Sequence, residues 1–266
     1  MIKVLVTGAA GRMGRQIVSL LLQEDDIEVV GATEVEGHPS IGKDVGKIIG
    51  MGKIDVLVSD NLDKAASEAD VVVDFTNPRA TLDAASYASL KGKPMVIGTT
   101  GFSSDEKVRL EELAGKFPCV VSPNMSIGVN VMFEITKKLA ELLGNEFDVE
   151  IIEAHHRQKK DSPSGTAIRL GEIVAEATGR DFSDVARFER HGHVGERGLN
   201  EIGIQAIRGG DIIGEHCVLF CGNGERVELT HRATNRDNFA RGAIRALRWI
   251  IGKPPGIYTM RDVLGI

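Results

Sequence analysis

The first fourteen residues constrain the fold more than any other part of the chain. An apolar run at residues 3–7 leads directly into glycines at positions 8, 11 and 14, after which a helical pattern begins. Glycines at a strand-to-helix turn allow a tight bend, a close approach of the backbone to a pyrophosphate, and close packing of helix on strand. The helix N-terminus then offers N–H groups to the phosphates. The spacing is GxxGxxG rather than the commoner GxGxxG, but its place between strand and helix predicts a dinucleotide-binding turn.

An acidic residue, Glu34, follows about twenty positions later, at the end of the second apolar run. A carboxylate there can accept hydrogen bonds from the adenosine ribose, and it repels a 2′-phosphate. The next residue is Val35, so no adjacent arginine compensates. We therefore predict NADH as the preferred coenzyme, with NADPH possible if Arg12 or a more distant cation reaches the phosphate.

The first half of the chain alternates short apolar runs with helical patterns, which predicts a parallel sheet covered by helices. The predicted strands are residues 3–7, 28–33, 55–59, 71–75, 94–98 and 119–122, and helices are predicted at 13–22, 79–90 and 104–116. Ligands of such sheets bind at the carboxyl ends of the strands. Further coenzyme contacts are therefore expected from residues 74–76, 98–102 and 122–125.

The pattern changes near residue 127. A helix at 129–143, a strand at 148–154 and a helix at about 166–178 are followed by three apolar runs, 202–208, 212–221 and 226–233, without intervening helices. The fold class predicted is α/β: a Rossmann-like parallel-sheet domain plus a second α+β domain with a mixed or antiparallel sheet. The first comprises residues 1–126 and 236–266, including a helix at 239–251 and a returning tail, and the second residues 127–235.

Composition excludes several classes of protein. The formal net charge of −6 argues against a nucleic-acid-binding protein, and no apolar run approaches the length of a membrane span. The N-terminus is typical of a strand rather than a signal peptide. The cysteines, Cys119, Cys217 and Cys221, are odd in number and form no CxxC pair, so no disulfide framework is expected. We expect a cytoplasmic protein.

The densest polar cluster is EAHHRQKKDSPSGTA at residues 153–167. Two histidines, one arginine and two lysines lie within six residues of an otherwise acidic chain, which favours an anionic substrate. Ser162 or a neighbour can cap the following helix, with Pro163 in its first position. The N–H groups of Ser164, Gly165 and Thr166 would then be unpaired and able to bind a carboxylate. Adjacent strand residues point to opposite faces and no HExxH motif is present, so no metal site is expected.

This cluster closely resembles the signature of the dihydrodipicolinate reductase family, E-x-H-H-x-x-K-x-D-x-P-S-G-T-A. The resemblance continues in order along the whole chain, at GAAGRMG (8–14), DFTNP (74–78), GTTGF (98–102), SPNMSIGVN (122–130), RHGHVGER (190–197), GDIIGEH (210–216) and MRDVLGI (260–266). It implies NAD(P)H-dependent reduction of 4-hydroxy-tetrahydrodipicolinate, by way of dihydrodipicolinate, to tetrahydrodipicolinate in diaminopimelate and lysine biosynthesis.

The resemblance also implies roles for individual residues and an oligomeric state. His155 would donate and accept a proton, Lys159 would donate one, and the substrate dicarboxylate would be bound by His156, Ser164, Gly165 and Thr166. The coenzyme would be held by Gly8, Ala9, Ala10, Gly11, Arg12, Met13, Glu34, Gly98, Thr99, Thr100, Ser122, Pro123, Asn124 and Met125. The family forms homotetramers through the sheet of the second domain. Val35 replaces a basic residue common in relatives, and Met125 replaces a phenylalanine.

Two other functions remain open on the sequence. The first is another two-domain nicotinamide oxidoreductase, such as a homoserine or aspartate dehydrogenase. The second is a non-catalytic dinucleotide sensor, which has no need of the cluster at residues 153–167.

Overall fold

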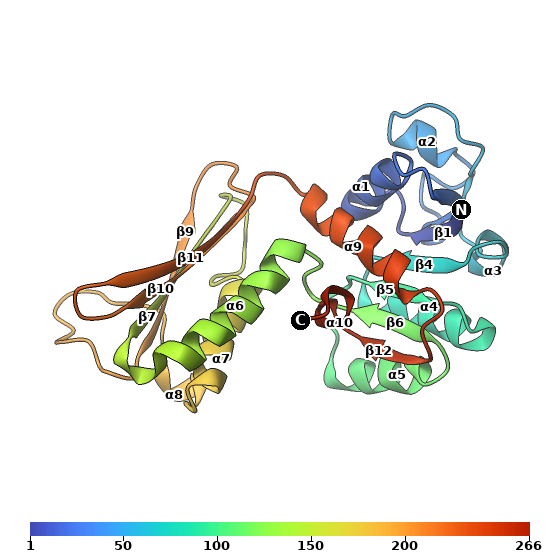
Figure 1. Ribbon diagram of the computed structural model, residues 1–266. Coiled ribbons are helices and arrows are strands. Elements are labelled where there is room, and N and C mark those ends of the chain that lie inside the picture. The colour runs from blue at the N-terminus through green and yellow to red at the C-terminus, as the bar shows by residue number, and fades with distance from the viewer. The chain divides into compact units, whose positions relative to one another are not determined.

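The computed structural model describes all residues from 1 to 266 and divides into two compact units (Figure 1). Unit 1 comprises Met1–Ile127 and Asp237–Ile266, and unit 2 comprises Gly128–Arg236. No helix combines the length and the hydropathy needed to cross a bilayer.

Unit 1 is built on a seven-stranded sheet in which every pairing is parallel. In sheet order the strands are β12 (Gly256–Tyr258), β6 (Pro118–Val121), β5 (Met95–Ile97), β4 (Val71–Asp74), β1 (Ile2–Thr7), β2 (Ile27–Thr33) and β3 (Val58–Ser59). The chain winds outward from β1 in both directions, as in dinucleotide-binding folds. The predicted Rossmann-like parallel sheet is confirmed, and the C-terminal tail returns to it as β12.

Helices cover both faces of this sheet, which explains why its strands are apolar throughout. On β1, Val4 and Val6 belong to one buried cluster and Leu5 to another. The first cluster includes α1 (Arg12–Leu21) and α9 (Asp237–Ile250), and the second includes α4 (Pro78–Lys91) and α5 (Ser104–Ala114). The short helices are α2 (Val45–Ile48), α3 (Leu62–Ala65) and α10 (Met260–Leu264).

The strand predicted at residues 55–59 is wrong over most of its length. Only Val58 and Ser59 pair with β2. Asp55 has a left-handed backbone with φ of 63°, and Leu57 forms an isolated antiparallel bridge with Asp44 instead. A left-handed residue turns the chain away from the extended path that a strand needs.

Unit 2 contains a five-stranded mixed sheet, as the sequence predicts. In sheet order its strands are β11 (Arg226–Ala233), β10 (Gly214–Cys221), β7 (Asp148–His155), β9 (Ile202–Arg208) and β8 (Ala186–Arg187). Strands β7, β9 and β8 run parallel, whereas β10 is antiparallel to β7 and β11. The strand predicted at 212–221 begins at Gly214, two residues later than predicted, because residues 209–213 form the turn that follows β9.

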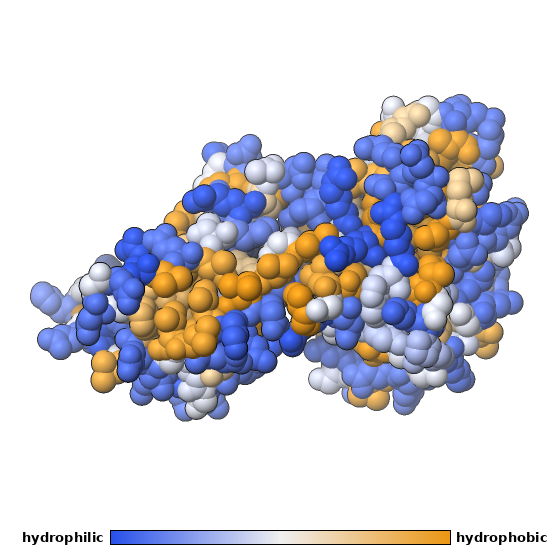
Figure 2. Space-filling view, viewed as in Figure 1, coloured by the Kyte–Doolittle hydropathy of each residue, from blue (hydrophilic) through white to orange (hydrophobic).

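One face of this sheet is covered by α6 (Ile127–Leu143) and α7 (Gly165–Ala177), with a core that includes Ile151, Leu170 and Phe220. The 3₁₀ turn η1 (Gly144–Glu146) and α8 (Phe182–Val185) complete the unit. Hydrophobic side chains also gather on the outside over α6 (Figure 2). Val131, Ile135 and Leu142, four and seven residues apart, are exposed there and share one helix face.

Candidate functional site

The glycine turn of unit 1 is a close-packed backbone cradle. Gly8 has φ of 60°, and α1 begins at Arg12 with Gly11 as an N-cap that has no side chain to occupy the helix start. A Cβ on Gly14 would lie 2.1 Å from the carbonyl oxygen of Gly8, so helix and turn touch through backbone. This is the geometry that lets a pyrophosphate approach a helix N-terminus.

Glu34 is fixed at this turn by a hydrogen bond. The N–H of Ala10 donates to its Oε1 at 2.8 Å, and the side chain of Arg15 donates from Nε to the carbonyl of Ala10 at 2.7 Å. Val35 is 70% exposed and Arg12 is exposed, so neither is committed to the protein interior. A dinucleotide fits this turn, because the backbone cradle leaves room for phosphates at the helix start.

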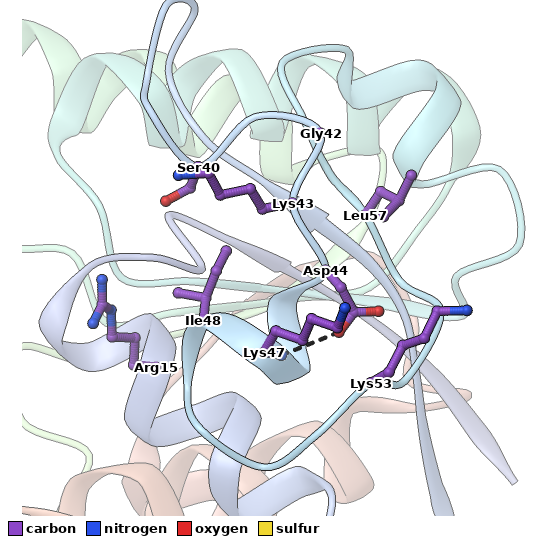
Figure 3. A pocket seen from close by; sticks show the side chains of 9 residues that line it. All are labelled: Arg15, Ser40, Gly42, Lys43, Asp44, Lys47, Ile48, Lys53 and Leu57. Atoms are coloured by element: carbon purple, nitrogen blue, oxygen red, sulfur yellow. Dashed lines mark hydrogen bonds between the residues drawn. The ribbon is translucent and has the colours of Figure 1, made fainter.

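A cavity of about 600 Å³ adjoins α1 on this side of the unit (Figure 3). Figure 3 shows Lys47 near its centre, with Arg15 and Lys53 at opposite ends. Its one carboxylate, Asp44, already accepts the backbone N–H groups of Lys47 and Ile54. The lining, which is cationic in a chain of net charge −6, consists of Arg15, Ser40, Gly42, Lys43, Asp44, Lys47, Ile48, Lys53 and Leu57.

A buried carboxylate organises the carboxyl ends of β1, β4 and β5. Asp74 is fully buried and accepts hydrogen bonds from four threonine hydroxyls, those of Thr7, Thr76, Thr81 and Thr99, at 2.6–3.0 Å. The sequence places Asp74 in a coenzyme loop but gives no sign that threonines from three other segments meet on it. The carboxylate therefore holds the predicted loops at 74–76 and 98–102 in fixed positions.

The third predicted coenzyme loop, at residues 122–125, is also held by internal contacts. Ser122 Oγ donates to the carbonyl of Asn124, and Met125 is buried where α9 crosses it. A Cβ on Gly242 of α9 would lie 1.7 Å from the Met125 carbonyl oxygen. A cavity of about 560 Å³ brings this loop together with the one after β5; its lining includes Thr99, Thr100, Gly101, Phe102, Val121 and Pro123.

In unit 2, His155 lies at the end of β7 and is hydrogen-bonded to a buried carboxylate. Glu153 is fully buried, and its Oε2 lies 2.6 Å from His155 Nδ1. Arg208 of β9 donates to both of its oxygens at 2.7 Å, and the N–H of Ser164 donates to Oε1 at 2.9 Å. A single carboxylate thus joins β7, β9 and the start of α7.

These contacts decide the charges of the two groups. Burial raises the pKa of Glu153, but the hydrogen bonds from Arg208 and His155 outweigh it and hold the pKa below its usual value. Burial lowers the pKa of His155 by more than the hydrogen bond to Glu153 raises it. Glu153 is therefore ionised and the imidazole neutral near neutral pH, with the proton on Nδ1.

The helix start is built differently from the prediction. Ser164, rather than Ser162, caps α7 by accepting the N–H of Ala167, and the helix begins at Gly165. The N–H of Ser164 is not unpaired, because it donates to Glu153. Gly165 remains open: a Cβ there would meet no heavy atom within 4 Å.

His216, which sequence reasoning left without a role, lies against the same cap. Its Nε2 is 2.9 Å from Ser164 Oγ, and its ring meets that of His155 edge-on at 5.3 Å between centroids. Burial, together with the proximity of His155, lowers the pKa of His216 to about 3, so the ring is neutral. The GDIIGEH segment contains His216, but sequence does not show that β10 carries it to the cap.

The rest of the cationic loop is held less tightly. Lys159 Nζ lies 2.8 Å from Asp161 Oδ2, and the hydrogen bond to Lys159 lowers the pKa of Asp161. His156 Nδ1 is buried and has no hydrogen-bond partner. No group of three or more His, Cys, Asp or Glu side chains is arranged to hold a metal ion. Unit 2 thus gathers His155, His156, Lys159 and the Ser164–Gly165 turn at one end of its sheet.

Comparisons with known proteins match the whole chain to one family. The model of the family described as dihydrodipicolinate reductase, N-terminus, matches residues 2–125, and that of its C-terminus matches residues 128–264. Proteins named 4-hydroxy-tetrahydrodipicolinate reductase from Geotalea daltonii and Anaeromyxobacter dehalogenans are 52% and 55% identical, covering 100% of this chain and 100% and 98% of theirs. A dipicolinate-bound dihydrodipicolinate reductase from Paenisporosarcina sp. TG-14 superposes with a TM-score of 0.76, at 27% identity over 98% of each chain. The chain therefore belongs to the dihydrodipicolinate reductase family.

Proposed function

We infer that the chain carries out the reaction of its family, in which 4-hydroxy-tetrahydrodipicolinate loses water and the resulting dihydrodipicolinate is reduced by NAD(P)H to tetrahydrodipicolinate. The observation that carries this inference is the loop from His155 to Gly165, where neutral imidazole, ammonium and an open helix start lie together. A dinucleotide sensor has no need of such a cluster. The similarity of a solved structure whose title describes bound dipicolinate supports a small dicarboxylate as the substrate.

Substrate binding falls to the groups at the start of α7. One carboxylate of the substrate is held by the N–H groups of Gly165 and Thr166, where the helix dipole adds a partial positive charge, while the N–H of Ser164 stays bonded to Glu153. His156, whose Nδ1 has no partner in the protein, contributes a further polar contact. The open space at Gly165 lets the carboxylate approach the backbone.

Proton transfer falls to Lys159 and His155. When bound, the reduced nicotinamide supplies the hydride, and the electron density that reaches the ring must then be met by a proton. Lys159 is the proton donor, and its hydrogen bond to Asp161 at 2.8 Å holds its amino group in this loop. His155, neutral with its proton on Nδ1, presents Nε2 to exchange a proton with the substrate.

We propose that NADH is the preferred coenzyme. It is held by residues 8–13, Glu34, 98–100 and 122–125, with the carboxylate of Glu34 on the ribose hydroxyls. Val35 offers no cation, but the lysines of the cavity in Figure 3 lie in the same unit, which keeps NADPH possible.

We further propose a cytoplasmic homotetramer built through the sheet of unit 2, as the family implies. The side of this sheet away from α6 and α7 carries half-buried Leu219 and Cys217, and Ile207 is 51% exposed. Apolar side chains on an open sheet face are typical of a surface that another subunit covers. Light scattering of the purified protein gives the subunit number; a monomer at assay concentration would refute the proposal.

The assay follows NADH oxidation at 340 nm with freshly made product of the preceding synthase. The wild type should oxidise NADH only when that product is present. His155→Gln and Lys159→Met should each lower kcat about 100-fold or more, because each removes a proton-exchanging group, while the Kd for NADH stays at the wild-type value. Wild-type turnover in both variants would remove these roles, and an inactive wild type would remove the function.

A further inference from the structure

The charged pair at the carboxyl ends of β7 and β9, Glu153 and Arg208, takes no part in these proton transfers. We infer that the two are positioning residues, which hold His155 and the start of α7 in one fixed arrangement around the substrate dicarboxylate. This inference rests on the proposed function, because it assigns a role within the same site. It concerns side chains that never touch the substrate.

The hydrogen bonds of Glu153 account for its whole acceptor capacity. A carboxylate has about four lone-pair sites. Two take the guanidinium of Arg208, one takes His155 Nδ1, and one takes the N–H of Ser164. Since the carboxylate is fully buried, water cannot replace a lost partner, and each partner is fixed relative to the others.

Arg208 extends the arrangement to the loop that carries Lys159. Its Nη2 also donates to the carbonyl oxygen of Asp161 at 2.8 Å, and the Asp161 side chain in turn accepts from Lys159. One guanidinium on β9 therefore fixes both the carboxylate behind His155 and the backbone beside Lys159. The pair of Arg208 and Glu153 therefore fixes both the proton-exchanging groups and the anion-binding turn.

The pairing of Glu153 with Arg208 also determines which nitrogen of His155 faces the substrate. Because the hydrogen bonds from Arg208 keep Glu153 ionised, its carboxylate can only accept hydrogen bonds. The Nδ1 of His155 therefore keeps its proton, and Nε2 carries none. On the other side of the ring, a Cβ at Gly214 would approach Nε2 to 3.0 Å, so Gly214 packs closely against the ring and a larger residue there would press on it. The charged or titratable groups facing this ring are Glu153, Lys159, Arg208 and His216.

A purely structural role would be served as well by apolar side chains. Burying an arginine–carboxylate pair costs desolvation that the attraction between the charges scarcely exceeds. Strand β7 offers a direct comparison, since Glu150, three residues earlier, also accepts two hydrogen bonds from one guanidinium, that of Arg190. No hydrogen bond joins Glu150 to His155 or Ser164, so Glu150→Gln serves as the control for the loss of an arginine-bound carboxylate on the same strand.

The test compares Glu153→Gln, Arg208→Lys and the control Glu150→Gln in the full-length protein. We expect Glu153→Gln to lower kcat about 10-fold to 100-fold, because a displacement of about 1 Å in a reacting group can cost about 100-fold. The KM for NADH should stay within about 2-fold of wild type. Since Glu153 raises the pKa of His155, the acid limb of the kcat–pH profile should move to lower pH in Glu153→Gln. Binding of pyridine-2,6-dicarboxylate, measured by calorimetry, should weaken about 10-fold in the same variant, because Glu153 no longer holds the start of α7 in place and a hydrogen bond to the bound carboxylate is weakened.

Arg208→Lys keeps the charge but loses the two-pronged contact, so its kcat should lie between those of wild type and Glu153→Gln. Glu150→Gln should match wild type in kcat, pH profile and inhibitor affinity. A wild-type kcat and pH profile in Glu153→Gln would overturn the inference. So would a fall in kcat that is equal in all three variants and accompanied by an equal fall in Tm. If Glu153→Gln fails to fold, Arg208→Lys decides: a lower kcat with an unchanged NADH KM supports the inference, and a wild-type kcat overturns it. Turnover by the wild type separates these outcomes from a failure of the proposed function.

Discussion

Replacing Gly14 by alanine tests whether the turn of unit 1 holds the coenzyme through its backbone. The new Cβ would lie 2.1 Å from the carbonyl oxygen of Gly8 and 2.7 Å from the Cα of Ala9, whereas real Cβ contacts are essentially never under 3.0 Å. Both neighbours are backbone atoms, so no side chain can move aside. The helix α1 must therefore retreat from the turn by about 0.9 Å, the shortfall from that limit.

A shift of this size separates the N–H groups of the helix start from the phosphates. Losing one hydrogen bond to a charged group costs about 1.5–3 kcal/mol, which corresponds to about a 10-fold to 100-fold rise in Kd. We expect such a rise for NADH, measured by the quenching of protein fluorescence or by calorimetry. Binding of pyridine-2,6-dicarboxylate to the free enzyme should change little, because the proposed dicarboxylate site lies in unit 2.

The matched control is Gly115→Ala at the end of α5. Gly115 has φ of −60°, and its Cβ would lie 3.4 Å from the carbonyl oxygen of Glu112, an ordinary contact. This variant should bind NADH as the wild type does. If Gly14→Ala also bound NADH with the wild-type Kd, the turn would not be the rigid cradle described here.

Three further predictions concern single side chains. The kcat/KM of the wild type should be higher with NADH than with NADPH. Glu34→Ala should lower this NADH-to-NADPH ratio of kcat/KM, because it removes the carboxylate that repels a 2′-phosphate. A higher kcat/KM with NADPH in the wild type would contradict the prediction. Ser164→Ala should destabilise the protein by about 1–3 kcal/mol in chemical denaturation, because it removes the cap of α7 and leaves His216 Nε2 buried without a partner; an unchanged unfolding free energy would argue against that role. Because the pKa of His216 falls from 6.5 to about 3 on folding, the unfolded chain binds one more proton between those values, and stability should fall as the pH is lowered through that window. His216→Gln should reduce this slope, and an equal slope would show that the ring does not contribute to it.

The fold could be predicted from sequence wherever the spacing of apolar residues and the positions of the glycines indicated the same element. The glycines at 8, 11 and 14 indicate a turn that opens a helix, and a continuous apolar run such as Val71–Val73 indicates a parallel strand buried on both faces. Residues 55–59 have the composition of a strand but not its conformation, because the left-handed backbone at Asp55 is not visible in the pattern. Short elements such as α2 and α8 were not predicted, since four residues are too few to show a period.

The site was predictable as far as it is continuous in the chain. His155, His156, Lys159 and the turn at Ser164 stand within ten residues, so their chemistry can be read together. Arg208 is 55 residues from the carboxylate that it pairs with. The pairing depends on β9 lying beside β7 in parallel, with His155 opposite Arg208. Register of this kind is set by tertiary packing, and no local pattern encodes it.

In the proposed active site, a two-carboxylate ring is held by the start of α7 beside His155. The most direct measurement is a crystal structure of the protein with coenzyme and pyridine-2,6-dicarboxylate. We predict one carboxylate of the inhibitor at about 3 Å from the Gly165 N–H, a hydrogen-bonding distance, with the ring within reach of His155 and Lys159. An inhibitor bound well away from the two adjacent imidazoles, with the α7 N-terminus facing only solvent, would contradict it.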